Sequence, residues 1–134
     1  MKKFFIILFI LTLPACYDTK NSTGNNQSDK NIHRFELHKT KNIFNSLLLD
    51  NRTGRIWQIQ YSLDDKSFEG AAPLSLKMYA KENGKNGRFK LTSTQNIWTF
   101  LLTDTSTGAV WHCQWGLDNK AFIGCSQIVN SISQ

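Results

Sequence analysis

The sequence predicts an all-β protein in which one structural unit is used twice. Residues 34–74 and 88–128 align without a gap, and 18 of the 41 aligned positions are identical. Similarity of this kind at a fixed spacing indicates an internal duplication. Inside each copy, apolar and polar residues alternate, which is the period of a strand with one buried face. We therefore expect two tandem β-sheet units.

Each copy contains three predicted strands that follow one another as an antiparallel meander. The first strand is Arg34–Lys39 in one copy and Arg88–Ser93 in the other, with Phe and Leu on one face. The second is Ile43–Leu49, and the third is Arg55–Leu63, where the alternation is strictest. The face rich in aromatic residues carries, in the two copies, Trp57, Ile59, Tyr61 and Leu63, and Trp111, Cys113, Trp115 and Leu117.

The second and third strands are predicted to form a hairpin at Asp50-x-x-Thr53-Gly54. Aspartate bonds the backbone two residues on, and glycine supplies the positive φ that closes a short turn. The second copy has the same residues at Asp104, Thr107 and Gly108.

A three-stranded sheet with one apolar face needs a partner to cover it. We expect the sister repeat to be that cover, with Trp57 and Trp111 in the core. The prediction is a small sandwich or barrel with an approximate twofold axis. Residues 33–134 form this single domain, the linker spans 75–87, and Ser75–Ala80 is an extra turn or strand.

The N-terminus has the pattern of a secretion signal. Lys2 and Lys3 precede an apolar run over residues 4–11, and small residues follow. This run is too short to span a bilayer, which needs roughly 20 residues. Residues 1–15 are therefore predicted to be a signal peptide.

The segment Leu13-Pro14-Ala15-Cys16 resembles the lipobox of bacterial lipoproteins. The resemblance implies that Cys16 is lipidated and becomes the first mature residue, which anchors the chain durably in a membrane. The alternative is ordinary secretion with a chance cysteine. Tyr17 stands where an Asp would favour inner-membrane retention, so we expect the outer membrane, on its periplasmic side, if the cell envelope has two membranes.

Residues 16–32 are predicted to be the lipid anchor and a flexible tether, because they contain almost no apolar side chains. Loss of residues 1–15 would lower the formal net charge from +6 to +4. The positive residues are scattered, without a run of like charges. Export and this scatter together disfavour nucleic-acid binding.

Cys113 and Cys125 both lie in the second copy, where the first has Ile59 and Ala71. Two cysteines that appear together at apolar positions of an exported chain indicate a disulfide. Two separate buried thiols are the alternative, and a catalytic thiol is disfavoured because no base is placed beside it.

No pattern of catalytic or metal-binding residues stands out. The three histidines have no metal-type spacing, and the aspartates that recur in both copies are explained by turns. We therefore expect no enzymatic activity, no metal and no cofactor. The residues considered are His33, His38, His112, Asp50, Asp104, Asp64 and Asp118.

Phe44, Trp98 and Phe100 form the candidate binding surface. Their strand presents apolar side chains to both faces, so one face would expose aromatic area if the other packs the core. The alternative is that these strands are buried on both sides.

The motif Asp-x-x-Thr-Gly-x-x-Trp, at Asp50–Trp57 and Asp104–Trp111, resembles the tryptophan motif of quinoprotein β-propeller repeats. The tryptophan here is one position closer to the glycine than usual, and two copies cannot close a propeller, so no quinone is implied. The motif is more similar to a hairpin in small bacterial and phage-associated proteins, a likeness that implies no activity.

These observations favour a non-enzymatic envelope lipoprotein that binds a protein partner near the membrane. A glycan-binding module that uses Phe44, Trp98 and Phe100 is the second hypothesis, and a hydrolytic enzyme is the third.

Overall fold

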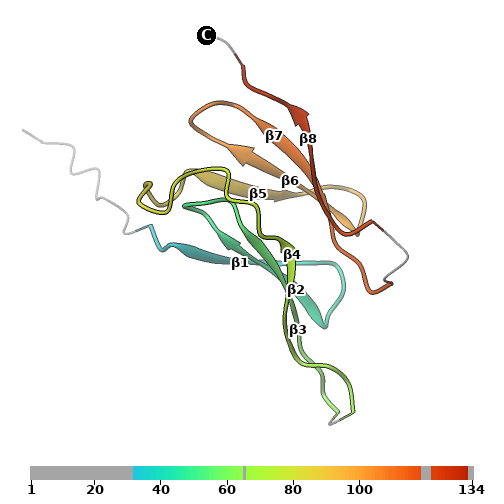
Figure 1. Cartoon of the computed structure of the whole chain (residues 1–134). Coiled ribbons are helices and arrows are strands. Elements are labelled where there is room, and N and C mark those ends of the chain that lie inside the picture. Colours follow the sequence, from blue (N-terminus) through green and yellow to red (C-terminus); the bar gives the residue numbers. More distant parts are fainter. Residues whose placement is uncertain (1–31, 65, 119–121, 133–134) are drawn as a thin grey trace, which may run out of the picture.

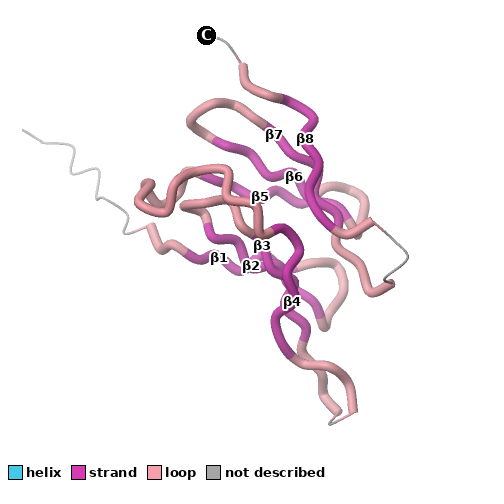
Figure 2. The backbone as a smooth tube through the Cα atoms, viewed as in Figure 1, coloured by secondary structure: helices cyan, strands magenta, loops and turns pink. Residues whose placement is uncertain are grey.

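The computed structural model describes residues 32–64, 66–118 and 122–132. All regular elements in these ranges are strands (Figure 2). They form two four-stranded antiparallel sheets that pack together in a sandwich-like arrangement (Figure 1). The predicted all-β class is confirmed. The predicted signal peptide, Cys16 and the tether as far as residue 31 lie outside the described residues.

Each sheet is a simple meander in which neighbouring strands follow one another in the chain. The first sheet consists of β1 (Phe35–Lys39), β2 (Asn45–Asp50), β3 (Ile56–Gln60) and β4 (Gly70–Ser75). The second sheet consists of β5 (Phe89–Ser93), β6 (Thr99–Asp104), β7 (Val110–Gln114) and β8 (Gly124–Val129). Equivalent strands begin and end at aligned residues, so the duplication in the sequence is also a duplication in structure.

Each sheet has four strands, whereas the alternation predicted three. The additional strands are β4 and β8, which pair with β3 and β7 at the sheet edges. The β4 sequence, Gly-Ala-Ala-Pro-Leu-Ser, has no alternation of large apolar and polar residues. Pro73 also lacks a backbone donor, and such a residue is tolerated only at an edge. The segment therefore forms a strand because β3 offers a free edge.

The predicted hairpin turn is present in both copies. Gly54 and Gly108 have φ values of +84° and +72°, a region that favours glycine. Their backbone N–H groups donate to the carbonyl oxygens of Asp50 and Asp104, both at 2.8 Å. The motif thus fixes the junction of the second and third strands of each sheet.

We call the face of each sheet that carries Trp57 or Trp111 its front, and the opposite face its back. The strand pairing places these residues on the two fronts: Phe35, Leu37, Leu48, Trp57 and Ile59 in the first sheet, and Phe89, Leu91, Leu102, Trp111 and Cys113 in the second. The back of the first sheet carries Leu47, Leu49, Ile56 and Gln58, and the back of the second carries Leu101, Thr103, Val110 and His112.

The core joins the front of the second sheet to the back of the first. Trp111 is buried with Phe89 as predicted, and Leu47 and Ile56 of the first sheet cover them. The prediction that Trp57 lies in the core was wrong, because its face is not covered by the sister sheet. The expected twofold relation between like faces does not occur either. Alternation separates the two faces of a strand but does not determine which one a neighbouring sheet covers.

The seam between the sheets is closed by the linker. The Tyr79 backbone N–H donates to the Thr53 carbonyl oxygen at 2.9 Å. The Tyr79 ring lies between the repeats, with ring centroids 4.3 Å from Trp111 and 6.2 Å from Phe89. The Phe89 N–H donates to the Asn51 carbonyl oxygen at 2.8 Å and fixes the start of β5.

Cys113 and Cys125 are opposite each other on β7 and β8, with Cα atoms 4.0 Å apart. Their sulfur atoms are at bonding distance, in agreement with the predicted disulfide. Ile59 and Ala71 occupy the same pairing in the first sheet. The disulfide therefore takes the place of an apolar cross-strand contact.

Candidate functional site

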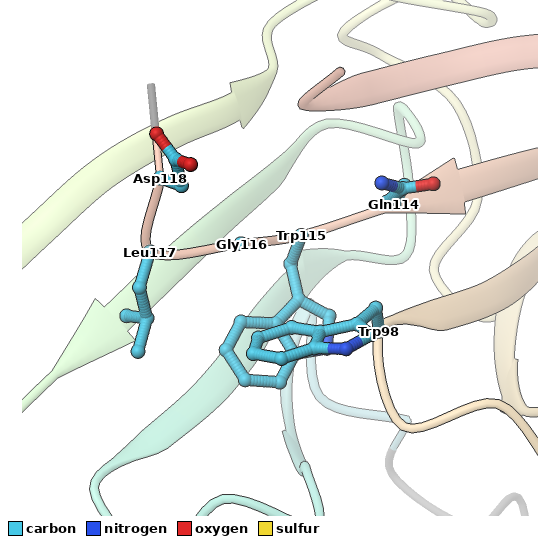
Figure 3. Close-up of a pocket in the computed structure, with 6 residues that line it drawn as sticks. All are labelled: Trp98, Gln114, Trp115, Gly116, Leu117 and Asp118. Atoms are coloured by element: carbon cyan, nitrogen blue, oxygen red, sulfur yellow. The ribbon is translucent and has the colours of Figure 1, made fainter. Parts of the chain in front are cut away.

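The strongest candidate site is a pair of surface pockets at the same place in the two repeats. The Phe44 pocket, about 240 Å³, is lined by Phe44, Gln60, Tyr61, Ser62, Leu63, Asp64 and Ser67. The Trp98 pocket, about 300 Å³, is lined by Trp98, Gln114, Trp115, Gly116, Leu117 and Asp118 (Figure 3). Six lining positions of the two pockets are equivalent in the repeat alignment. Two of them are aromatic in both repeats, and three carry the same residue in both, namely Gln, Leu and Asp.

Each pocket is built on two aromatic rings in contact. The ring centroids of Trp98 and Trp115 are 4.8 Å apart, and those of Phe44 and Tyr61 are 5.9 Å apart in an edge-to-face arrangement. Figure 3 shows the two indoles lying against each other, with Leu117 on the same side of the chain. Trp115 is fully buried, whereas Trp98 is 36% exposed and presents the accessible ring.

The second ring of each pair, Trp115 or Tyr61, makes the same hydrogen bond, although Trp115 is buried and Tyr61 is 47% exposed. The Trp115 Nε1–H donates to the Ile97 carbonyl oxygen at 3.0 Å. The Tyr61 hydroxyl donates to the carbonyl oxygen of Ile43, which is the equivalent residue. The buried Trp115 Nε1–H is thereby satisfied, as such groups require, and the bond from the exposed Tyr61 hydroxyl restrains that ring in the same orientation.

The first ring of each pair, Trp98 or Phe44, is positioned by an Asx-type turn. The backbone N–H of Trp98 donates to Asn96 Oδ1 at 2.9 Å, and that of Phe44 donates to Asn42 Oδ1 at 2.8 Å. Side-chain acceptors of this kind hold a short turn in one conformation. The recurring asparagine thus orients the first ring of each pair.

Asp64 combines a structural role with a place on the pocket wall. Its Oδ1 accepts from the backbone N–H groups of Lys66 and Ser67, at 3.0 and 2.8 Å. These bonds, with the one from Lys66 the largest contribution, lower the pKa of Asp64 below its ordinary value. The carboxylate is therefore an ionised acceptor at neutral pH beside the Phe44 ring.

Of the three predicted surface residues, two line the pockets and one does not. Phe44 and Trp98 lie on the surface, 37% and 36% exposed, but in separate pockets. Phe100 is buried on the front of the second sheet, so its assignment to a binding surface was wrong. The strand does present apolar residues to both faces, and the core covers the face that Phe100 occupies.

The sequence analysis missed Tyr61 and Trp115 as parts of the site. Alternation assigned both to the core face, and Trp115 is indeed buried in the core, whereas Tyr61 is exposed. Both lie just beyond β3 and β7 and contact the Trp98 or Phe44 ring. The available signal was the aromatic character of both positions in both repeats.

The repeated aspartates in the hairpins form a structural ion-pair network. Asp50 is fully buried and accepts two bonds from Arg34, at 3.1 and 2.9 Å, and one each from Thr53 and Arg55, at 2.7 and 3.1 Å. Burial alone would raise the pKa of Asp50, but these donors outweigh it and hold the pKa well below the ordinary value. Asp104 is held in the same way by Arg88 and Thr107. Every donor belongs to the fold, as the turn interpretation predicted.

The histidines do not gather into a site. His38 lies on the back of the first sheet, 3.6 Å from Glu36, and burial lowers its pKa, while Glu36 opposes this shift. His112 lies on the back of the second sheet. Within the described ranges, no three His, Cys, Asp or Glu side chains are grouped so that they could hold a metal ion.

Comparison with known proteins finds no matching family model, curated protein or solved structure. The part of the chain that the structure describes contains no helix long and apolar enough to cross a membrane.

Proposed function

We propose that this protein is a non-enzymatic binding protein whose Phe44 and Trp98 pockets each bind a sugar unit of a carbohydrate. The observation that carries the proposal is the recurrence of one pocket design in both repeats. Residues that only pack a core need not reproduce a solvent-facing ring with its supporting turn. Both repeats do so, through Asn42 and Asn96.

The chemistry of the pockets suits a ligand that is apolar on one face and polar around its edge. The exposed rings offer a flat apolar surface, while the glutamine of each pocket and the Asp64 carboxylate of the Phe44 pocket offer donors and acceptors. A pyranose has this character, with C–H groups on its faces and hydroxyls around its edge. Both pockets are open and shallow enough to accept one unit of a longer chain.

A protein partner near the membrane is the second candidate. It would insert an apolar side chain against the Phe44 or Trp98 ring, because exposed aromatic residues are frequent anchors of interfaces. The separation of Phe44 from Trp98 into two small pockets favours small repeated ligands instead. In either case, the lipid anchor proposed at Cys16 would hold the binding domain at the envelope.

The proposal is tested by titrating the full chain with oligosaccharides of the bacterial envelope. The part of a tryptophan fluorescence change that Trp98→Ala abolishes reports on the Trp98 pocket, and calorimetry gives the number of sites. We expect two sites per chain. The variants Trp98→Ala and Phe44→Ala should each retain one site, and the double variant should retain none.

Phe35→Ala is the matched control, because Phe35 is an exposed phenylalanine outside both pockets. This variant should keep both sites. Absence of binding by the folded chain across the glycan panel would contradict the proposal. Capture of a peptide that competes at Trp98 would replace it with the protein-partner hypothesis.

A further inference from the structure

The two repeats meet through unlike faces, and among the described residues this leaves one face of each repeat without a covering sheet. The intramolecular seam joins the back of the first sheet to the front of the second. The front of the first sheet and the back of the second lie on the outer sides of the pair, which Figure 1 shows as two successive layers. Each free face is the counterpart of a face that is already used in the seam.

The free front has the residues of the buried front but not its cover. Leu37 is 61% exposed, whereas the equivalent Leu91 is 6% exposed. Phe35 is 49% exposed, whereas the equivalent Phe89 is fully buried. A contiguous exposed apolar face on a small protein marks an interaction site.

The free front also has the geometry of the buried front. The ring centroids of Phe35 and Trp57 are 6.5 Å apart, and those of Phe89 and Trp111 are 6.4 Å apart. The aromatic pair is therefore already arranged as in the seam. Because the front of the second sheet is covered by the back of the first, the free front of the first sheet should also fit the back of such a sheet.

The back of the second sheet is the uncovered face of this chain that could cover such a front. On the second sheet, Leu101, Val110 and Ile128 take the positions of Leu47, Ile56 and Leu74, which form the covering face in the seam. Ile128 is 58% exposed. Thr103 replaces Leu49, so this back is less apolar than its counterpart.

The residue that closes the seam also has a free counterpart. The Ile132 N–H donates to the Thr107 carbonyl oxygen at 3.0 Å, as the Tyr79 N–H does to the carbonyl oxygen of Thr53. Tyr79 then packs on Phe89 and Trp111, but the Ile132 side chain is 67% exposed. It lies where it would meet the Phe35 and Trp57 of a following sheet.

We propose that a second copy of this chain occupies these faces, with the first-sheet front of one copy packed on the second-sheet back of the next. The contact repeats the intramolecular seam, so its faces already match. Such an interface is heterologous, and it continues into a closed ring or an open filament. The segment 17–31 of the chain has Tyr17 as its one large apolar residue, so it offers little to cover the face.

The mass of the purified full chain in detergent, measured by native mass spectrometry across concentrations, is the first test. We expect oligomers. Leu37→Glu should weaken association by about 100-fold or more, because it places a charge in an apolar interface. Leu63→Glu is the matched control, since Leu63 is an even more exposed leucine outside the front, and it should leave association unchanged. A single-chain mass at all concentrations would overturn the proposal.

Cross-linking distinguishes the proposed contact from other dimers. Ile132→Cys and Phe35→Cys are introduced in separate chains, each with Cys16→Ser, and the two are mixed with a short bismaleimide. By analogy with Tyr79 and Phe89, the mixture should give products that join the two introduced cysteines, and neither variant alone should cross-link. Dimers of Phe35→Cys alone would show a front-to-front contact and would overturn the head-to-tail arrangement.

Discussion

The guanidinium of Arg34 binds the carboxylate of Asp50 through two hydrogen bonds, at 3.1 and 2.9 Å, across sixteen residues of chain. Arg34 immediately precedes β1, and Asp50 ends β2, so the pair ties together one end of these two strands. Thr53 and Arg55 donate to the same carboxylate. Arg88 and Asp104 repeat the arrangement, at 3.0 and 2.8 Å, in the second sheet.

Replacement of the buried carboxylate should therefore be costly. We expect Asp50→Asn to lower the free energy of unfolding by about 3 kcal/mol, because Arg34 and Arg55 lose the buried charge that they surround and keep only the more exposed Glu82. Urea denaturation followed by tryptophan fluorescence measures the change. Asp64→Asn is the control, because Asp64 is exposed and has no arginine partner among its hydrogen bonds, and it should cost much less. Equal losses in the two variants would refute the structural role of the network.

The Cys113–Cys125 disulfide should stabilise the second sheet mainly by closing a short loop. The cysteines are 12 residues apart, and a loop of this size contributes about 3 kcal/mol. The double variant Cys113→Ile with Cys125→Ala installs the Ile59 and Ala71 pair of the first sheet. It should fold with the same secondary structure, as circular dichroism would show, but should unfold at a lower urea concentration. An unchanged midpoint would mean that the disulfide adds no stability beyond that of the Ile–Ala contact.

Stability should decrease in mild acid because of His38. Burial lowers its pKa, although Glu36 partly opposes this, so the folded state holds the neutral imidazole more strongly than the unfolded state does. The unfolded chain takes up the proton first as the pH falls through about 6.5. The stabilisation is thus complete above that pH and is lost as the pH falls towards the folded pKa. Unfolding free energies from pH 8 to pH 5 would show the slope.

His38→Gln should remove this part of the slope, since the variant has no proton to bind at that position. His112→Gln retains His38 and should retain the slope. If the pH profile of His38→Gln matches that of the unchanged chain, another group is responsible.

Much of the fold could be predicted because the duplication shows each strand twice. The Asp50 and Asp104 turns, the strand order and the pairing of Cys113 with Cys125 all follow from local chemistry that the aligned residues share. The edge strand β4 could not be predicted, because its sequence has no alternation. Its conformation depends on pairing with β3.

The choice of face could not be predicted, and the error on the candidate site has the same origin. Trp57 and Trp111 occupy equivalent positions of the two repeats, yet only Trp111 is covered by the other sheet. Phe100 was placed on the surface because both faces of its strand are apolar. These outcomes depend on which sheet lies on which face, a long-range relation that no residue pattern within one strand contains.

The glycines of the two hairpin turns offer a final test of the seam, because they have similar backbones and unlike neighbours. Alanine at either position meets a positive φ, which costs about 1–2 kcal/mol. At Gly54 the added Cβ would also lie 2.8 Å from Tyr79 Cδ2, inside the packed seam. At Gly108 it would meet Ile132 at 3.2 Å, and this exposed side chain can move aside.

Gly54→Ala should therefore lose clearly more unfolding free energy than Gly108→Ala, and it should also perturb the near-ultraviolet circular dichroism of the Tyr79 and Trp111 rings. Gly116→Ala is the control, since its φ is not positive and the nearest atoms would be 3.8 Å from the new Cβ, so its stability should stay within about 0.5 kcal/mol. Equal losses for Gly54→Ala and Gly108→Ala would mean that Tyr79 yields as easily as the exposed Ile132. The linker would then contribute little to holding the two sheets together, and the seam would depend on the contact of the sheet faces alone.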